Sequence, residues 1–475
     1  MRDPGNRNRR SRVSAWSTPD LPSSACIRGR PGWSLSKRGV ELINHSLVRE
    51  IGPTLRADPS RVVIRPFVPG DDPTVPDPAL RSRIGRIIER IVTLDAQTCR
   101  SELERILASL AGRHGDVEQV LLRRCNDLVC PPAIPSPGLT KDQMLLIGAY
   151  MSAEYSYESA ALFNPSIVPH PEAAKVAGAS RFLLSLRAVG EGHLSSITFR
   201  TGHFDGSHVE LDPVSAISTP PRVKPLPGGE ADDPGVRLTC GSFPDISSLV
   251  IFPVTFRQRH GLEDLRLTRF EEENGYSFYL GTYTAAGGET VRQELLRTTD
   301  FQSFELSALR TEVSDTKGIA IFPRRIAGHY AALARLDHES IWLLRSNDIY
   351  NWTDGAIILR PCFPWEFVQL GNCGSPIELD EGWLVITHGV GPVRDYSLGA
   401  CLLDKENPAR VLGRSTSPLI TTDPKDRDGY VPNVVYSCGA LLHERTLLLP
   451  LSSPTLSSAS PLSTSIGCWP HSAEA

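Results

Sequence analysis

Apolar residues recur at helical spacing in the first third of the chain. Apolar positions at i, i+3, i+4 and i+7 begin at Ile84 and again at Leu103, which is typical of one buried helix face. Thr140 and Gln143 form a capping box ahead of an apolar run, so another helix is predicted to start there. With a strand predicted within residues 60–72, residues 46–160 are expected to form an N-terminal strand and helical extension.

From about residue 163 the pattern changes to short apolar strands separated by turn residues, and helical periodicity is absent over the following part of the chain. The predicted strands lie at 181–187, 194–200, 248–256, 276–283, 329–335, 340–345, 383–388, 398–404 and 446–450. Many short strands at near-regular spacing favour a sandwich, a barrel or a propeller. Residues 203–240, rich in Pro, Gly and Asp, are predicted to be an exposed insertion.

A weak internal repeat favours the propeller among these three. Five times, a cluster of turn and polar residues precedes a hairpin-like pair of strands, near residues 163, 261, 316, 371 and 429. Inner strands of a propeller bring such polar ends to a central funnel. We therefore predict a mainly β protein, a five-bladed β-propeller over residues 161–450 preceded by the helical segment.

Both ends of the sequence differ from this body. Residues 1–40 carry nine Arg or Lys against Asp3 and Asp20, a net charge of +7, with little apolar periodicity. Residues 1–45 are therefore predicted to be a disordered basic tail, with a transit peptide and a misassigned start as the alternatives. Residues 451–475 hold eight Ser and a single charged residue, Glu474, which predicts an atypical, disordered C-terminal tail.

Composition and charge narrow the classes of function. The 475 residues carry a formal net charge of only −4, which argues against bulk electrostatic binding of nucleic acid. No apolar run reaches the length of a membrane span, so no membrane partner is expected. Ten cysteines include no CxxC pair, and we predict no metal site and no cofactor. A cytoplasmic location is expected, and a homo-oligomer is left open.

Glu191 lies between two glycines at the end of one predicted strand and before the next. Glycines leave a carboxylate uncrowded and let a ligand approach closely. An ordinary hairpin turn with a solvated glutamate explains the same residues.

A second polar cluster, Glu263, Asp264 and Arg266, precedes an apolar stretch. Carboxylates paired with an arginine can hold sugar hydroxyls or a phosphate; the alternative is a surface salt-bridge cluster. Lys317 at a strand start suits an anionic co-substrate, although a solvated charge is commoner.

Another group of polar residues flanks the predicted strand at 383–388: Asn372, Ser375, Glu378 and His388. A hydrogen-bonded structural histidine is the alternative for His388. No phosphate-cradling glycine loop, GxSxG elbow or HExxH motif is present.

Six segments, in order, resemble glycoside hydrolase family 130, the mannoside phosphorylases and related β-mannosidases. They are FNPSIV (163–168), LSLRAVGEGHLSSITFRTG (184–202), GLEDLRL (261–267), KGIAIFPRRIAGHYAAL (317–333), NCGSPIELDEGWLVITHGVG (372–391) and VPNVVYSCGALLH (431–443). The resemblance implies a five-bladed propeller with its active site in the central funnel, and it likens the helical segment to the N-terminal extension of longer members.

The resemblance also implies roles for individual residues. Glu191 matches the general acid, at a position where phosphorylases commonly have Asp, and Lys317 and Arg266 match residues that phosphorylases direct toward phosphate. Substrate-binding positions are implied at Asn164, Arg187, His193, Asp264, Arg266, Asn372, Ser375, Glu378 and His388.

Two departures from the phosphorylase pattern bear on the reaction. Phosphorylases tend to have a Lys-Asp pair and a later His-Arg-Pro, where this chain has Lys317-Gly318 and Ala334-Arg335-Leu336. Both reactions of the family invert configuration in one displacement, but hydrolysis needs a second carboxylate to activate water. We therefore expect a hydrolase for β-mannosides, 1,2-linked ones included, with Glu191 as acid and Glu263 as base.

Two alternatives stay open. The first is an inverting β-mannoside phosphorylase that takes inorganic phosphate as co-substrate and releases mannose 1-phosphate. The second is a carbohydrate-binding propeller without turnover, because the closing region after Pro450 departs from the family's usual Pro-Tyr-Gly pattern. In each case the partner is a small-molecule mannoside.

Overall fold

A computed structural model describes most of the chain. The described residues are 49–71, 74, 82–129, 138–172, 178–227, 235–241, 245–288, 290–311, 316–422, 431–453 and 463–470. The predicted basic tail at 1–45 lies outside them. No helix in this part of the chain is long and apolar enough to cross a membrane.

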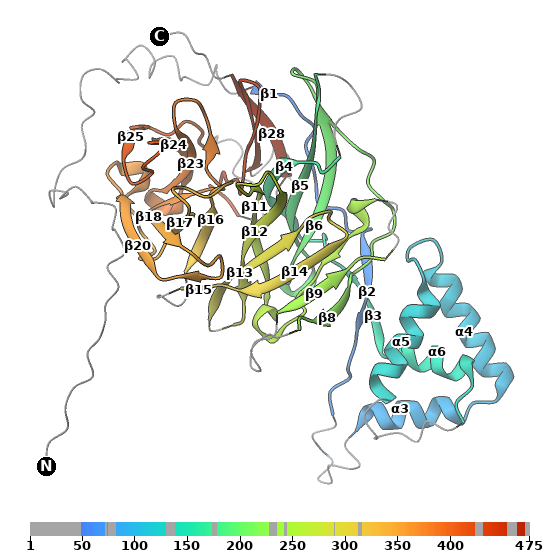
Figure 1. Ribbon diagram of the computed structural model, residues 1–475. Coiled ribbons are helices and arrows are strands. Elements are labelled where there is room, and N and C mark those ends of the chain that lie inside the picture. The colour runs from blue at the N-terminus through green and yellow to red at the C-terminus, as the bar shows by residue number, and fades with distance from the viewer. Residues whose placement is uncertain are drawn as a thin grey trace, which may run out of the picture.

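In the described part of the helical extension, four helices pack on one another beside the β-sheets (Figure 1): α3 (Arg83–Val92), α4 (Ala96–Leu110), α5 (Val117–Val129) and α6 (Lys141–Tyr150). The predicted start of α6 is confirmed, since the Thr140 and Gln143 side chains each bond the other residue's backbone N–H. Helix α5 was not predicted. Its Cys125 is buried in the shared core with Ile88, Ile91 and Leu146.

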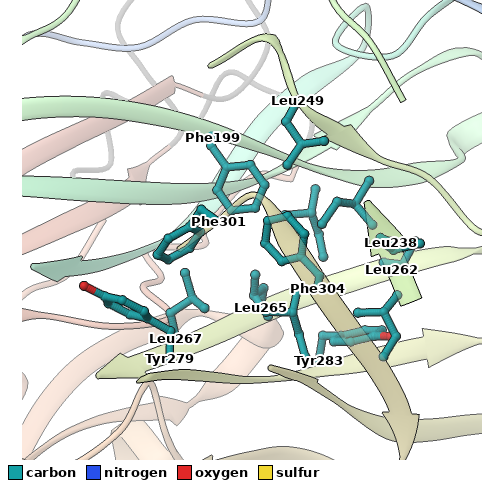
Figure 2. Packing of buried hydrophobic residues seen from close by; sticks show 14 of the residues in the cluster. Phe199, Leu238, Leu249, Leu262, Leu265, Leu267, Tyr279, Tyr283, Phe301 and Phe304 are labelled. Atoms are coloured by element: carbon teal, nitrogen blue, oxygen red, sulfur yellow. The ribbon is translucent and has the colours of Figure 1, made fainter. Parts of the chain in front are cut away.

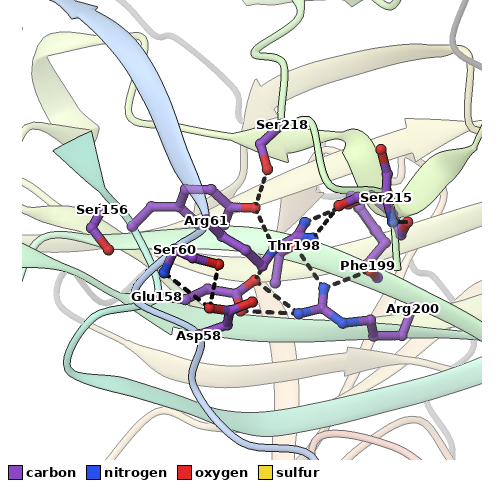
Figure 3. A network of polar contacts seen from close by, with 12 residues as sticks. Asp58, Ser60, Arg61, Ser156, Glu158, Thr198, Phe199, Arg200, Ser215 and Ser218 are labelled. Atoms are coloured by element: carbon purple, nitrogen blue, oxygen red, sulfur yellow. Dashed lines mark hydrogen bonds and ion pairs between the residues drawn. The ribbon is translucent and has the colours of Figure 1, made fainter. Parts of the chain in front are cut away.

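Strand β2 (Val62–Pro66) precedes the helices in the sequence and strand β3 (Ser152–Ser156) follows them. The two strands pair with each other. Next to them lies a buried charge network (Figure 3). Glu158 is fully buried, and its carboxylate accepts hydrogen bonds from Arg61 Nε at 3.0 Å and from Arg200 Nη2 at 2.9 and 3.0 Å. Arg61 also donates to the carbonyls of Ser215 and Ser247. The network therefore ties the chain entering the extension to the first large sheet.

The β part begins with an eleven-stranded sheet made of two antiparallel sets. The first set contains β4 (Ala161–Pro169), β5 (Ser180–Val189), β6 (Ser195–Phe204), β7 (Val209–Leu211) and β10 (Val250–Ile251). The second contains β11 (Gly261–Glu271), β12 (Ser277–Ala286), β13 (Val291–Thr298), β14 (Ser303–Ala308), β9 (Val236–Thr239) and β8 (Arg222–Pro225). One parallel pair, Gly261 with Ser195, joins the sets, and we call them the first and second sheets.

The remaining strands form three further sheets of four or five strands. The third sheet contains β16 (Lys317–Ile321), β17 (Tyr330–Arg335), β18 (Ile341–Ser346) and β20 (Asp354–Leu359). The fourth contains β21 (Gln369–Asn372), β22 (Ile377–Glu378), β23 (Trp383–Val390), β24 (Tyr396–Leu403) and β25 (Val411–Arg414). The fifth contains β1 (Arg49–Glu50), β26 (Leu441–His443), β27 (Thr446–Ser453) and β28 (Ser463–Pro470). A small parallel pair joins β15 (Arg310–Thr311) to β19 (Asn351–Trp352).

Apolar side chains pack between neighbouring sheets. Between the first and second, Phe199 and Phe304 stack with ring centroids 6.2 Å apart, and Phe301 and Tyr279 close the cluster (Figure 2). Trp383 of the fourth sheet lies edge-on to Phe322. These cores fix the sheets relative to one another, and the ends of their first strands carry the candidate site.

Two regions differ from the sequence-based expectation. Within 451–475, for which we predicted disorder, β27 continues to Ser453 and β28 pairs with it and with β1. Within 203–240, predicted to be an exposed insertion, β7, β8 and β9 add strands to the sheets. In both places backbone pairing organises a segment whose composition lacks an apolar pattern. The mainly β class is confirmed, and the five-bladed closure stays a prediction.

Candidate active site

Four sheets present side chains at equivalent positions of their first two strands. In the first, second and fourth sheets the third cross-strand pair from the strand ends is Phe163 with Arg187, Glu263 with Thr284, and Gly371 with His388. In the third sheet the matching pair is the first, Lys317 with Arg335, which precedes a shift in pairing as the pairs of the first and second sheets do. The next residue of each first strand is Asn164, Asp264, Gly318 or Asn372. A repeated register thus gathers residues that lie far apart in the sequence.

The first strands of three sheets are irregular at this point. The pairing shifts between Phe163 and Ser166, between Glu263 and Arg266, and between Lys317 and Ala320. Asn164, Asp264 and Gly318 have φ of 51°, 57° and 84°. Bulges and left-handed residues redirect side chains and are frequent beside active sites. The backbone is thus shaped to turn Asn164 and Asp264 toward each other.

The first and second sheets meet in a network of charged groups. Arg187 donates from Nη2 to Glu263 Oε1 at 2.8 Å and from Nη1 to Asp264 Oδ1 at 3.3 Å. Asn164 Nδ2 donates to the same Asp264 oxygen at 2.6 Å. Burial alone would raise the pKa of the Asp264 carboxyl, but Arg187, Arg266 and the Asn164 hydrogen bond hold it below its ordinary value. Asp264 is therefore an ionised, acceptor-only group.

Arg266 is a buried neighbour of this network and connects the second sheet to the fourth and fifth. Its side chain is buried and donates to the Cys373 carbonyl at 2.8 Å, the Tyr436 hydroxyl at 2.9 Å and the Asp264 carbonyl at 3.1 Å. Arg266 therefore holds the Asp264 backbone in place relative to Cys373 and Tyr436.

Lys317 of the third sheet and Asn372 of the fourth sheet complete the candidate site. Lys317 Nζ lies 3.4 Å from Glu263 Oε2, and its side chain keeps 42% of its accessible surface. Asn372 Nδ2 donates to the Gly318 carbonyl at 3.0 Å. Glu263 thus has a cation at each of its two oxygens, from the first sheet and from the third.

Arg335, beside Lys317, forms a pair with His388. Arg335 Nη1 and Gln369 Nε2 lie 3.2 and 3.0 Å from His388 Nε2. Burial, followed by the charges of Arg335 and Arg266, keeps the pKa of His388 well below its ordinary value, so the ring is neutral. Because both neighbours can only donate, Nε2 is the acceptor and Nδ1 carries the proton.

The packing at Gly371 shows how tightly this pair is held. A Cβ added there would lie 2.5 Å from His388 Cε1 and 2.9 Å from Arg335 Nη1. Any larger residue would therefore displace the pair. Arg335 Nε is buried without a hydrogen-bond partner within the described residues, which leaves a donor for a bound group.

Glu191 and His193 stand on the hairpin between β5 and β6, in the short helical turn η1 (Glu191–His193). Both are exposed, and the Tyr155 hydroxyl donates to the Glu191 carbonyl at 2.8 Å. Ser195, at the end of this hairpin, accepts from Arg187 Nε at 2.9 Å. The hairpin is therefore attached to the charged cluster, while Glu191 itself makes no contact with Glu263.

The side chains of two predicted substrate-binding residues form no hydrogen bond or ion pair with the cluster within the described part of the chain. Glu378 accepts from Arg324 at 2.8 and 2.9 Å and pairs with Lys405 at 3.2 Å, and these bonds, Arg324 first, lower its pKa. The Ser375 hydroxyl oxygen is buried without a partner among the described residues. The structure therefore brings together Asn164, Arg187, Glu263, Asp264, Arg266, Lys317 and Asn372, with His388 joined through Arg335.

Sequence reasoning missed Arg335, Gln369 and Tyr436 as site residues. Each enters through a pairing between sheets, and no local motif marks it. The shared register with Arg187 is the signal that identifies Arg335.

The arrangement suits an anion and a neutral polar ligand. Arg187 and Lys317 contact the carboxylates of Glu263 and Asp264, and the charges of Arg266 and Arg335 also act on Asp264, so four cations accompany two carboxylates. Among the described residues no group of His, Cys, Asp and Glu could hold a metal ion. The carboxylates and the amides of Asn164 and Asn372 offer hydrogen bonds to hydroxyls, and the surplus positive charge suits a negatively charged co-substrate.

A family model described as beta-1,4-mannooligosaccharide phosphorylase, of glycoside hydrolase family 130, matches residues 242–450. This span includes the second, third and fourth sheets and the start of the fifth.

Two curated relatives are similar to part of the chain. A 1,2-beta-oligomannan phosphorylase from Thermoanaerobacter sp. (strain X514) is 32% identical over 198 residues, which are 41% of this chain and 64% of the relative. A beta-1,2-mannobiose phosphorylase from Listeria innocua is 30% identical over 205 residues, 42% of this chain and 56% of that one. The match thus spans less than two thirds of either relative.

Among solved structures, the beta-1,2-mannobiose phosphorylase from Listeria innocua in complex with beta-1,2-mannobiose aligns with 66% of this chain and 90% of its own. The TM-score is 0.46 and the identity 21%. The sequence matches, rather than this alignment, carry the likeness: over residues 242–450, this chain is similar to glycoside hydrolase family 130.

Proposed function

We propose that this protein is an inverting β-mannoside phosphorylase, which transfers a mannosyl group to inorganic phosphate. The observation that carries the proposal is the surplus of cations at the site: Arg187, Arg266, Lys317 and Arg335 against two carboxylates. A phosphate dianion would balance this charge and would receive charge-assisted hydrogen bonds. The phosphorylases among the curated relatives support the same reaction.

In this mechanism a phosphate oxygen attacks the anomeric carbon on the face opposite the leaving group. The bond from that carbon to the glycosidic oxygen breaks, and Glu191 gives its proton to the leaving oxygen. The products are mannose 1-phosphate of inverted configuration and the shortened mannoside. Lys317 and Arg335, which are cross-strand partners, would hold the phosphate, while Asn164 and Asp264 would hold the sugar.

Hydrolysis remains the second candidate, because Gly318 replaces the aspartate common in phosphorylases and Glu263 supplies another carboxylate. As a base, Glu263 would have to accept a proton from water. Its two oxygens already face Arg187 and Lys317, at 2.8 and 3.4 Å. This occupancy favours phosphate over activated water.

We also infer that the five sheets close into a five-bladed propeller. Contacts between consecutive sheets support a ring. Leu267 N donates to Ser166 Oγ, Thr282 Oγ1 to the Ile319 carbonyl, Asn372 to the Gly318 carbonyl, Tyr396 N to the Asn433 carbonyl, and Cys438 N to the Pro165 carbonyl. Each contact joins one sheet to the next, and the last one returns to the first sheet.

Product analysis with β-1,2- and β-1,4-mannobiose, each with and without phosphate, tests the proposed reaction. We expect mannose 1-phosphate to form at a rate that rises with phosphate, and no turnover without it. Release of free mannose at the same rate in both conditions would establish hydrolysis instead. A mannoside that raises the melting temperature but is never cleaved would favour the binding alternative.

Replacing Arg335 with Gln tests the role of that side chain. Loss of one charge-assisted contact, worth about 1.5–3 kcal/mol, should raise the KM for phosphate by about 10- to 100-fold, because this donor lies at the proposed phosphate position. The KM for the mannoside should change much less. The matched control is Arg324→Gln, which removes a guanidinium bound to Glu378 outside the cluster. Equal effects on both KM values would contradict the assignment.

A further inference from the structure

Two hairpins of the molecule, in different sheets, have the same conformation. One joins β5 to β6 at 190–194 and carries Glu191; the other joins β23 to β24 at 391–395 and contains the short turn η5 (Pro392–Arg394). Gly190 has φ, ψ of −109°, −160°, and Gly391 −101°, −159°. The central residues Gly192 and Val393 have φ of 68° and 56°.

The equivalence extends from the hairpins to the site residues. Arg187 lies two residues before Val189, which pairs with Ser195; His388 lies two residues before Val390, which pairs with Tyr396. Ser195 bonds Arg187 at 2.9 Å, and the Tyr396 ring stacks on His388 with centroids 6.1 Å apart. The second hairpin is therefore attached to the candidate site through the equivalent residue, by a ring stack in place of the hydrogen bond of the hairpin that carries Glu191.

The second hairpin differs in what it exposes. Val393 keeps 90% of its accessible surface, and Phe367 and Val368, which precede β21, keep 62% and 59%. The Val368 N–H donates to the Val390 carbonyl at 3.0 Å, so these apolar residues adjoin the hairpin. Arg394 is exposed and has no ion pair within the described part of the chain.

The backbone of this hairpin is also strained. Val393 and Arg394 both lie in the left-handed region, with φ of 56° and 57°, where the first hairpin has Gly192 and His193. A β-branched residue is unusual in this region, because its side chain crowds the backbone there. The strain keeps an apolar side chain and a cation at an exposed position beside the site.

We propose that Phe367, Val393 and Arg394 form a distal sugar-binding subsite, which contacts mannosyl units beyond the pair that flanks the cleaved bond. The apolar faces of pyranose rings suit Phe367 and Val393, and the Arg394 guanidinium supplies donors for sugar hydroxyls. A neutral sugar chain continuous with the site fits this mixture of apolar surface and a single cation. The inference rests on the proposed action on β-mannosides and adds that the protein selects longer chains.

The test compares mannobiose with mannotetraose of the same linkage in the variant Phe367→Ser/Arg394→Ala. We expect the ratio of kcat/KM for tetraose over biose to fall about tenfold, since an apolar contact and a hydrogen bond are lost. Phe256→Ser is the matched control, because Phe256 is 79% exposed and precedes β11 of the second sheet; its ratio should equal that of the wild type. An unchanged ratio in the double variant would overturn the subsite.

Calorimetric binding of mannotetraose separates this inference from the proposed function. If the wild type binds and cleaves mannosides and the double variant binds mannotetraose equally well, the subsite is wrong and the function stands. If the wild type binds neither mannoside, the proposed function fails and the subsite with it. The wild type could also bind mannotetraose without cleaving it, while the double variant binds it more weakly. That result would support the subsite and reject the proposed turnover.

Discussion

Replacing Glu191 with Gln should lower kcat for β-mannobiose by roughly 10²- to 10⁴-fold, the contribution typical of a positioned general acid. The amide keeps the size of the side chain but has no proton to give to the leaving oxygen. Because Glu191 is exposed on its hairpin and makes no ion pair among the described residues, the substitution should leave the fold intact. Steady-state kinetics with phosphate present would measure the effect.

The leaving group supplies the decisive comparison for this variant. A 4-nitrophenyl β-mannoside has a leaving oxygen that departs without protonation. The substitution Glu191→Gln should therefore lower kcat far less for this substrate than for β-mannobiose. Glu210→Gln, which changes a carboxylate whose side chain is 77% exposed, serves as the control. Unchanged turnover in Glu191→Gln would remove this residue from the mechanism, and equal losses on both substrates would indicate damage unrelated to protonation.

Replacing Glu158 with Gln should lower the free energy of unfolding by about 3–5 kcal/mol. The carboxylate is fully buried and is the acidic partner of both Arg61 and Arg200 (Figure 3). Without it, two guanidinium groups would remain buried with no opposite charge in contact. Urea denaturation, followed by tryptophan fluorescence, would measure the loss.

An exposed ion pair provides the matched control for the buried one. Glu172 pairs with Arg181 at 2.5 Å, but its side chain is 74% exposed, and such pairs contribute about 0–1 kcal/mol. Glu172→Gln should therefore be nearly neutral. A loss below about 1 kcal/mol in Glu158→Gln would mean that water or another group compensates the two arginines.

The elements with a strong local signal were predictable from the sequence. The isoleucine spacing identified α3, the Thr140 capping box identified the start of α6, and the apolar run at 181–187 lies within β5. Helix α5 was missed, although its apolar residues Val117, Val120, Leu121 and Leu128 also recur at helical spacing. Strand β28 depends on partners rather than on its own composition, so a segment rich in serine did not indicate it.

The site was predictable only in part, for a related reason. Glu263, Asp264 and Arg266 are neighbours in sequence, so a local pattern revealed them. The contacts of Arg187 with Asp264 and of Arg266 with Cys373 span 77 and 107 residues, and only the relative placement of the sheets creates them. Glu378 was included because it lies in a matching segment, yet its bonds direct it to Arg324 and Lys405.

The repeated register has a consequence for how such a protein can change its chemistry. Arg187, Thr284, Arg335 and His388 occupy one equivalent position on four sheets, and Phe163, Glu263, Lys317 and Gly371 occupy its partner. Gly371 is the exception, because a larger residue there would displace Arg335 and His388; each of the other positions lies on its own hairpin, so a substitution at one leaves the backbone of the others in place. A site that uses phosphate can therefore differ from a site that uses water by only a few side chains on the same backbone. These eight positions are the ones to substitute when a change of nucleophile is engineered or traced.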